Sequence, residues 1–360
     1  MTQAAGEKLH HWFATRELRE PPLLSCIAHR LGWERQALRY SLERLAETGF
    51  IDATANSAAL QIALRQHFPQ GGWYINLGQN HMNMDLMRAL SGGGLKRMMM
   101  LHDTIPLDFP QFVEPHSRDE MSRLVAIISR ECDLAVCNSD ATAADLLRHS
   151  RIMFGEAPKG RVISAHLGVD DVGTRTVGKL PPQIDPDRPF FLILGTIEPR
   201  KNHALLLDVW EDLARRFLPH KMPQLVIAGR WGWMVDDFRA RLESHLLYGQ
   251  SVFVVEGPDD STVSALMQEG RALMMPSFSE GYGLPVVEAI CAGLRVIAAP
   301  HDVYREIVGE VPIYCALGDV PAWSKAVERL SVPVKLPALV NEVRLPLWED
   351  HFARVRAALG

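Results

Sequence analysis

The chain has 360 residues, of which 47% are hydrophobic and 22% are charged. This balance is typical of a soluble globular protein and excludes an intrinsically disordered chain, while the length predicts two domains of ordinary size. The formal net charge is −5, from 38 basic and 43 acidic residues. Such a charge excludes a polycation whose main task is to coat nucleic acid.

Cysteine usage and the distribution of apolar residues predict a cytoplasmic protein. The cysteines are odd in number, lack a C-x-x-C spacing and stand among apolar residues, so we expect reduced core thiols and no zinc site. They are Cys26, Cys132, Cys137, Cys291 and Cys315. No segment reaches the roughly 18 apolar residues of a membrane-spanning helix, and the N-terminus lacks the apolar run of a signal peptide. Any contact with the inner face of a membrane is therefore expected to be peripheral.

The first 66 residues are predicted to be mainly helical. Residues 23–51, LLSCIAHRLGWERQALRYSLERLAETGFI, resemble a winged helix-turn-helix module. The second helix of that module mixes both signs of charge, which disfavours a DNA-binding face. Its charged residues are Arg35, Arg39, Arg44, Glu34, Glu43 and Glu47. We therefore favour a plain helical pair packed on the first lobe, and keep binding of DNA or of a partner as the alternative.

Strand-like apolar runs with helical segments between some of them continue the first lobe. They are GGWYINLG (71–78), LKRMMMLHD (95–103), CDLAVCNS (132–139) and GRVISAHLG (160–168). The pattern predicts a first α/β sheet within an N-terminal domain of residues 1–180. The proline-rich segment GKLPPQIDPDRPF (178–190) has no periodicity and predicts the linker.

The second half alternates strands and helices more regularly. Strands are predicted at 189–197, 224–230, 251–257, 271–277 and 295–299, and helices at 203–217, 236–248, 261–270 and 285–292. Consecutive β-α units predict a doubly wound parallel sheet, and such sheets bind ligands at the carboxyl ends of their strands. We therefore predict an α/β fold with two Rossmann-like domains, the second covering residues 186–342. A closing amphipathic helix is expected within residues 343–360.

A glycine-rich turn separates two glutamates in FSEGYGLPVVEAICAGLRVIAA, residues 278–299. Pro285 suits the first turn of a helix and Gly293 its end, so the segment between the glutamates enters that helix. Glycines at 281 and 283 let backbone N–H groups approach an anion, which the helix N-terminus also attracts. We therefore predict a phosphate site at this turn.

The two glutamates are candidates for binding sugar hydroxyls. Glu288 lies about one turn into the helix, where a carboxylate can accept hydrogen bonds from the vicinal hydroxyls of a ribose. Glu280, on the loop, can do the same for another sugar ring. The alternative is that Glu280 is a surface residue and that Glu288 only interacts with the helix dipole.

A cation pair in GTIEPRKN, residues 195–202, favours the functional interpretation. Arg200 and Lys201 follow the first strand of the second lobe and immediately precede a helix. A departing nucleoside diphosphate carries about two negative charges, which a guanidinium and an ammonium can stabilise. The pair and the two glutamates are therefore expected to bind one activated donor.

Together, EPRKN (198–202) and SEGYGLPVVEAICAGLRVIAA (279–299) resemble the family 4 glycosyltransferases of the GT-B fold, which carry a Glu-x7-Glu signature and an Arg/Lys pair. The resemblance covers the second lobe almost entirely. It extends upstream, toward bacterial polysaccharide-type members, through LHDTIPLDFP (101–110), CNSDATAADL (137–146) and AHLGVD (165–170).

The resemblance implies a retaining glycosyltransferase that moves a sugar from a nucleotide-diphosphate sugar to a hydroxyl of a glycan or lipid-linked glycan. No metal and no further cofactor are implied. By matching motif, Arg200 and Lys201 hold the diphosphate, Glu288 the ribose and Glu280 the donor sugar. Further donor contacts are implied for Gly281, Tyr282, Gly283, Leu284, Gly195 and Thr196, and contacts with the base for Gly229, Arg230, Glu256 and Gly257.

In the first lobe, His102 and Asp103 end a predicted strand and are expected to border the substrate cleft. The family places a histidine of this kind near the donor sugar, and His102 is our candidate. The alternative is that its imidazole only bonds the backbone. Asn138 and Ser139 end the next strand and are further candidates for substrate binding.

One departure from the family pattern concerns the acceptor. Family members usually open with a strand and a glycine-rich loop that helps to receive the acceptor, but this chain has no glycine between Gly6 and Gly32. Two other functions also stay open: a regulator with a nucleotide-sugar-sensing body, and a different GT-B enzyme such as an epimerase or a phosphorylase. The intact set of Arg200, Lys201, Glu280 and Glu288 favours the transferase, because a sensor has no need of leaving-group cations.

Overall fold

The computed structural model describes residues 57–78, 82–169, 177–332 and 344–360. By their contacts these residues form two compact units. The first holds the described residues up to Leu107, then 116–167 and 348–360; the second holds 108–115 and the described part of 168–347. The unit boundary at residues 167–168 lies upstream of the predicted linker. The winged-helix hypothesis for residues 23–51 falls outside the described residues.

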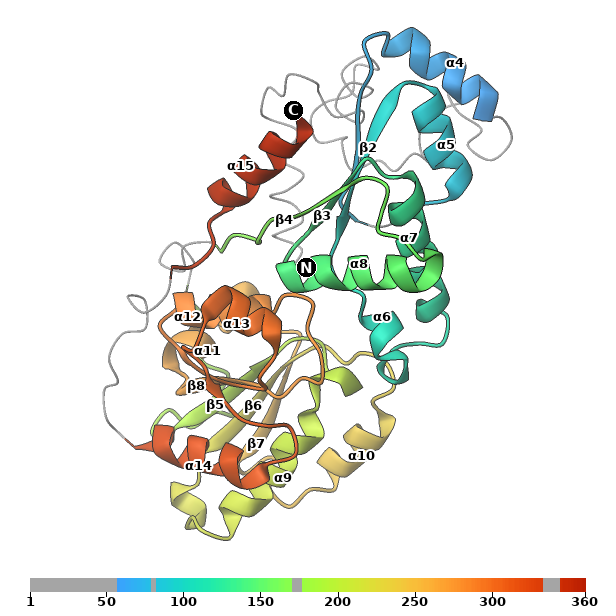
Figure 1. The fold of residues 1–360 in the computed structure, drawn as a ribbon. Coiled ribbons are helices and arrows are strands. Elements are labelled where there is room, and N and C mark those ends of the chain that lie inside the picture. The colour runs from blue at the N-terminus through green and yellow to red at the C-terminus, as the bar shows by residue number, and fades with distance from the viewer. Residues whose placement is uncertain (1–56, 79–81, 170–176, 333–343) are drawn as a thin grey trace. The chain divides into compact units, whose positions relative to one another are not determined.

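The first unit is built on a four-stranded parallel sheet (Figure 1). Its strands β1 (Gly72–Asn76), β2 (Leu95–Leu101), β3 (Leu134–Cys137) and β4 (Arg161–Ser164) lie side by side in that order. All four fall within the segments that were predicted to be strands. Because β2 and β3 are central, they are mostly apolar and buried, as expected for a parallel sheet covered by helices. The exceptions are Lys96 and Arg97 near the start of β2, of which only Lys96 is exposed. The carboxyl ends of these strands meet at one edge, where β2 leads to His102 and β3 to Asn138.

Helices of the first unit pack around this sheet. They are α4 (Ser57–His67), α5 (Met84–Gly92), α7 (Ser117–Glu131), α8 (Asp140–Phe154) and α15 (Trp348–Leu359), with the short α6 (Ile105–Asp108) at its border. The last helix was predicted as a closing helix, and the structure adds that it belongs to the first unit. The Trp73 indole donates to the carbonyl of Leu359 (3.0 Å), and Nδ1–H of the buried His351 donates to the carbonyl of Ala165 (3.0 Å).

The second unit has a six-stranded parallel sheet in the order β10-β9-β8-β5-β6-β7. Its strands are β5 (Phe190–Leu194), β6 (Gln224–Gly229), β7 (Val252–Glu256), β8 (Ala272–Met275), β9 (Arg295–Ala298) and β10 (Ile313–Tyr314). Strands β6 and β7 extend from one side of β5, whereas β8 lies on its other side. The direction of winding therefore reverses between β5 and β8. In open α/β sheets, ligands bind beyond the carboxyl ends of the strands at such a reversal.

The helices of the second unit are α9 (His203–Ala214), α10 (Asp236–Glu243), α11 (Asp260–Glu269), α12 (Leu284–Cys291), α13 (Asp302–Val308) and α14 (Val320–Ser331). Helix α9 buries its apolar side chains against the sheet and α14, so that Trp210 and Trp323 are both fully buried. The Trp210 indole donates to the carbonyl of Pro223 (2.9 Å), which satisfies its only donor inside the core.

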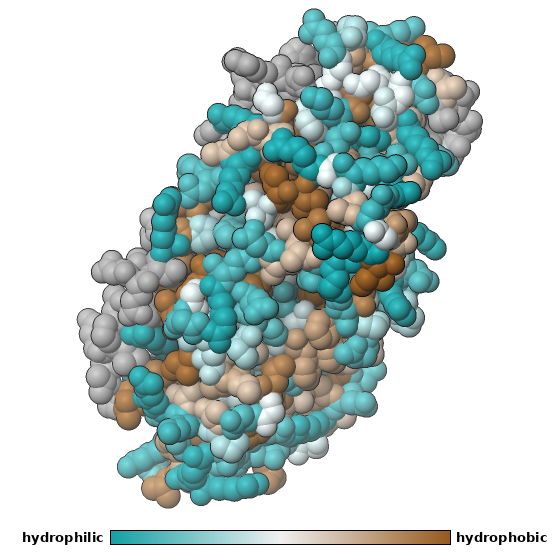
Figure 2. All heavy atoms as spheres, viewed as in Figure 1, coloured by the Kyte–Doolittle hydropathy of each residue, from teal (hydrophilic) through white to brown (hydrophobic). Residues whose placement is uncertain are grey.

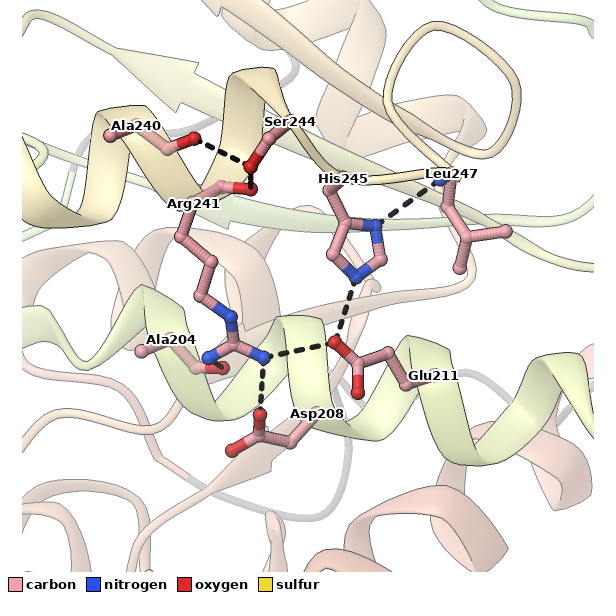
Figure 3. A network of polar contacts seen from close by, with 8 residues as sticks. All are labelled: Ala204, Asp208, Glu211, Ala240, Arg241, Ser244, His245 and Leu247. Atoms are coloured by element: carbon pink, nitrogen blue, oxygen red, sulfur yellow. Dashed lines mark hydrogen bonds and ion pairs between the residues drawn. The ribbon is translucent and has the colours of Figure 1, made fainter.

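A network of polar contacts connects α9 with α10 and with the residues that follow α10 (Figure 3). The Arg241 guanidinium bonds Asp208 and Glu211, and the His245 ring donates Nε2–H to Glu211 (2.9 Å). His245 accepts at Nδ1 from the backbone N–H of Leu247, which fixes its tautomer. Hydrophilic residues predominate on the molecular face shown in Figure 2, with apolar residues scattered among them. Within the described ranges, every helix is too short or too polar to cross a bilayer.

Candidate functional site

Two glycines bring the carboxyl ends of β5 and β6 into close contact. A Cβ atom on Gly229 would lie 1.8 Å from the carbonyl oxygen of Gly195, so no larger residue fits there without moving the backbone. Gly195 has φ +133°, a backbone conformation that favours glycine. The Lys201 side chain passes over Gly195, with its Cε 3.5 Å from where a Cβ would stand. Glycine is therefore favoured at 195 by its backbone conformation, while the lysine passes the strand end at an ordinary van der Waals distance.

The loop after β5 is anchored to the loop after β8. Pro199 starts a short 3-10 turn, Pro199–Lys201, and α9 follows after Asn202, which has φ +56°. The backbone N–H of Phe278 donates to the carbonyl of Arg200 (2.8 Å), and the Asn202 amide donates to the carbonyl of Pro276 (3.2 Å). These bonds join the two strand ends that flank the reversal of the sheet.

A cluster of four charges lies at this junction. Lys201 Nζ is 2.6 Å from Glu280 Oε1, and an Arg200 amino nitrogen is 3.2 Å from Glu280 Oε2. Arg200 also donates to the carbonyl of Ser279 (2.6 Å) and bonds the carboxylate of Glu198. Between 3% and 15% of each charged side chain is exposed. The predicted cation pair and the first glutamate of the signature therefore do converge.

The two carboxylates of the cluster differ in proton affinity. Burial by itself raises the pKa of Glu280, but Lys201 and Arg200 outweigh it and lower that pKa to about 2. For Glu198, burial raises the pKa, and the same two cations offset only part of the rise. The difference follows from the contacts among the described residues, because Glu280 forms ion pairs with both cations whereas Glu198 forms one with Arg200.

The turn after Glu280 leads into α12. Tyr282 is buried and Gly283 has φ +85°; a Cβ on Gly283 would stand 2.3 Å from Cε1 of Tyr304. Helix α12 then begins at Leu284, with a proline in its first turn as predicted. Glu288 is half-buried on this helix. The positive φ of Gly283 thus turns the chain from the loop that carries Glu280 into α12.

Replacing Gly283 by Ala should destabilise the protein more than the same change at Gly293. Both glycines flank α12 with positive φ, +85° and +77°, so both alanine variants carry the cost of a left-handed backbone, about 1–2 kcal/mol. Only at Gly283 does the new methyl group meet another side chain, which should add about 1–3 kcal/mol. Urea unfolding of the two variants measures the difference, and equal stabilities would contradict the clash.

The residues predicted to face the base lie together at the ends of β6 and β7. Gly229 and Glu256 are register partners, and the N–H of Gly257 donates to the carbonyl of Gly229 (3.1 Å). Gly257 has φ +57°, and the side chain of Arg230 runs alongside it. Arg230, Glu256 and Gly257 are exposed. Thr196 is also exposed, at the adjoining end of β5.

In the first unit, His102 and Asn138 share an unusual arrangement. His102 donates Nε2–H to the carbonyl of Leu77 (2.9 Å), and the Asn138 amide donates to the carbonyl of His102 (2.8 Å). His102 Nδ1 and Asn138 Oδ1 are buried and have no hydrogen-bond partner among the described residues. Burial lowers the pKa of His102 and favours the neutral ring. The alternative for His102, a bond to the backbone, accounts for one ring nitrogen only.

Asp103 and Ser139 have clear structural tasks. Asp103 accepts from the N–H of Ile105 (3.0 Å) at the start of α6, and Ser139 accepts from the N–H of Thr142 (3.0 Å) as the N-cap of α8. Such caps stabilise helix termini. A role in substrate binding therefore stays a prediction for both, and it would have to coexist with these bonds.

Two kinds of residue at the site were not predicted from the sequence. Glu198, two positions before Arg200, was quoted within the motif but given no role. The other kind is aromatic: the Phe112 ring stacks on Phe278 with centroids 4.7 Å apart, and the Trp233 indole donates to the carbonyl of Phe112 (2.9 Å). Glu198 could have been noticed because it stands only two positions before Arg200. No local sequence pattern connects Phe112 with Phe278.

Comparison with known proteins is consistent with this geometry. Residues 179–331 match the family model described as Glycosyl transferases group 1. A serotype-specific mannosyltransferase, WbdA, of Escherichia coli is 30% identical over 261 residues, which are 68% of this chain and 30% of that protein. An O-antigen chain mannosyltransferase B of Escherichia coli is 25% identical over 228 residues, 62% of this chain and 58% of that protein. The chain thus spans about a third of the length of the first of these relatives.

Solved structures support the fold. Anabaena HepE in complex with UDP and glucose aligns with a TM-score of 0.61 and 14% identity, over 88% of each chain. Sucrose-phosphate synthase from Thermosynechococcus elongatus aligns with a TM-score of 0.57 and 16% identity, over 85% of this chain and 78% of that one. With its two parallel α/β sheets the chain has the GT-B fold, and its residues 179–331 form a domain of the group 1 glycosyl transferases.

Proposed function

We propose that the protein transfers a sugar, with retention of anomeric configuration, from a nucleotide-diphosphate sugar to a hydroxyl of a glycan or lipid-linked glycan. The observation that carries the proposal is the convergence of Arg200, Lys201 and Glu280 where the winding of the second sheet reverses. The names of the relatives, which are mannosyltransferases including one of O-antigen chains, favour a hexosyl donor and a polysaccharide product. A lipid-linked acceptor would be met by peripheral contact with a membrane surface.

The cations are assigned to the leaving diphosphate. As the bond between the sugar and the diphosphate breaks, negative charge grows on the diphosphate oxygens, and donors fixed in a water-poor site stabilise it strongly. Arg200 and Lys201 are suited to this because the Ser279 carbonyl and Glu280 hold them in place. Glu198 and Glu280 balance the charge of the pair in the free protein, so Arg200 and Lys201 would stabilise the diphosphate by sharing their N–H donors and their charge with it. The N-terminus of α12 contributes backbone N–H groups to the same anion.

The remaining assignments concern the sugars and the base. Glu288 on α12 is assigned to the ribose hydroxyls. The strand ends at Gly229, which is buried, and Glu256, which is exposed, are assigned to the base. In the first unit, the unpartnered acceptors His102 Nδ1 and Asn138 Oδ1 suit the O–H groups of a neutral sugar, because a hydroxyl can donate to each. An anionic group would offer these two atoms no proton.

Stabilisation of the folded protein by donor compounds tests the proposed function. A ligand that binds only the native state raises its melting temperature. We expect at least one member of a panel of UDP-, GDP- and dTDP-hexoses, mannose and glucose forms included, to raise the Tm in a concentration-dependent manner. Nucleoside monophosphates serve as the control, because they lack the second phosphate. A protein that responds to no member of the panel would contradict the proposal.

Replacing Glu288 by Gln should weaken binding of the nucleoside diphosphate by about 1–3 kcal/mol, because the amide offers the ribose hydroxyls only one acceptor oxygen and no charge. Titration calorimetry gives the affinity. Glu269→Gln is the matched control, because Glu269 is exposed at the end of α11. If both variants bind as tightly as the unmodified protein, the ribose assignment is wrong.

A further inference from the structure

The charge cluster of the second unit balances itself. Arg200 and Lys201 bring two positive charges, and Glu198 and Glu280 bring two negative charges, so the four side chains carry no net charge when all are ionised. Only 3% of the Glu198 side chain and 7% of the Glu280 side chain are exposed. Buried charges depend on their partners because water no longer solvates them. Any further charge brought to this cluster therefore disturbs an existing balance.

A nucleoside diphosphate would bring about two or more negative charges to two cations that already serve two carboxylates. If the cations keep their bonds, each is shared with the diphosphate. If Arg200 turns toward the diphosphate instead, Glu198 loses its ion pair with that guanidinium. In both cases less positive charge remains for a buried carboxylate. Such a group takes up a proton when this costs less than staying ionised.

Among the described residues, the titratable groups that interact with the four charges of the cluster can be compared as proton acceptors. Glu280 bonds both cations, and its pKa of about 2 shows how strongly they favour its ionised form. His203, the first residue of α9, is buried beside Lys201, and its pKa is lowered to about 3, so its ring resists a proton. Tyr304 on α13 is already protonated, because burial raises its pKa well above the usual value. Burial also raises the pKa of Glu198, which leaves this carboxylate as the acceptor.

We propose that Glu198 neutralises Arg200 within the cluster and takes up one proton from solvent when a nucleoside diphosphate binds. The inference rests on the proposed function, because it needs a diphosphate at Arg200 and Lys201. It makes Glu198 a positioning residue: it holds the guanidinium between its own carboxylate and the Ser279 carbonyl, and its charge is removed when the anion arrives. The protonated carboxyl group becomes a hydrogen-bond donor, whereas the carboxylate can only accept.

The proposal predicts that nucleoside diphosphate binding strengthens as the pH falls. Binding that takes up protons gains affinity with decreasing pH, by up to about tenfold per pH unit for one proton. The gain is confined to the interval between the pKa of Glu198 before binding and its higher pKa afterwards. A nucleoside diphosphate exchanges a proton of its own near neutral pH, so a variant without the carboxylate is needed as the reference.

Calorimetry in paired buffers tests the proposal. UDP, GDP and dTDP are titrated into the full-length protein and into Glu198→Gln between about pH 6 and about pH 8, in two buffers of different ionisation enthalpy at each pH. The dependence of the heat on the buffer counts the protons taken up. We expect the unmodified protein to take up about half to one proton more than Glu198→Gln at one or more of these pH values. Glu198→Asp, which keeps a carboxylate, should restore the uptake.

Each outcome decides something different. Equal proton uptake by the unmodified protein and Glu198→Gln, with both binding, would overturn the inference and leave the proposed function intact. A merely structural role for Glu198 would weaken binding without changing the proton count. Absence of binding to all three nucleotides would overturn the proposed function and the inference with it. If Glu198→Gln does not fold, Glu198→Ala takes its place as the reference without a carboxylate, and proton uptake equal to that of the unmodified protein would contradict the proposal.

Discussion

Replacing Lys201 by Ala should lower turnover by about two to three orders of magnitude, because it removes one of the two cations assigned to the leaving diphosphate. The Lys201 ammonium is buried over Gly195 and bonds Glu280, so its position is fixed before the reaction begins. A donor that needs no rearrangement stabilises the transition state without a reorganisation cost. Steady-state transfer with the donor identified by thermal stabilisation measures kcat and kcat/KM.

A control variant at a second lysine shows whether an effect on turnover comes from removing the charge at the site or from removing any lysine charge. Lys221 is exposed in the second unit, in the turn Pro219–Lys221. This turn precedes the start of β6, whereas the candidate site lies at the carboxyl ends of the strands. Lys221→Ala should keep its turnover close to that of the unmodified protein. Near-normal turnover of Lys201→Ala, with its fold verified by circular dichroism, would contradict the diphosphate assignment.

Replacing Glu280 by Gln should destabilise the folded protein by about 3–5 kcal/mol, because it leaves Lys201 and Arg200 buried with Glu198 as their remaining carboxylate. Urea unfolding at neutral pH measures the loss. The matched control is Glu243→Gln, which breaks the exposed pair between Arg239 and Glu243 on α10. That exposed pair is solvated and screened, so its loss should change stability little.

The pH dependence of this stabilisation has a definite sign. Glu280 has a pKa of about 2 in the folded protein, below the value near 4.3 expected in an unfolded chain. The stabilisation from its ionised form is therefore complete above about pH 4.3 and is lost as the pH falls toward about 2. The stability difference between the unmodified protein and Glu280→Gln should shrink over the same interval. A difference independent of pH would show that the charge of Glu280 is not the cause.

The strands and most helices could be predicted because their signals are local. The central parallel strands are buried on both faces and appear as short apolar runs, as in Ala272–Met275, where all four residues are buried. Helix α12 was found from a proline at its start and a glycine at its end. The two-residue strand β10 and the seven-residue helix α13 were not predicted, because such short elements carry little periodicity. Helix α14 was not predicted either, although its buried side chains Trp323, Ala326, Val327 and Leu330 have helical spacing.

The candidate site was predicted in part. The convergence of Arg200, Lys201 and Glu280 was expected, since parallel strands end at one edge of a sheet. The charge balance was not expected. Nothing in the sequence shows that Glu198 turns its carboxylate toward Arg200, because the direction of a side chain in a loop is set by what packs around it.

Sequence alone determined that the chain has α/β units with a cation pair and a Glu-x7-Glu turn, because apolar periodicity, glycines, prolines and motif spacing are properties of neighbouring residues. Only the tertiary structure decided which charges are partners, that Phe112 stacks on Phe278, and that the last helix packs with the first unit. These contacts join residues up to 286 positions apart, such as Trp73 and Leu359. Contacts of that kind depend on the whole packed chain, and no local pattern records them.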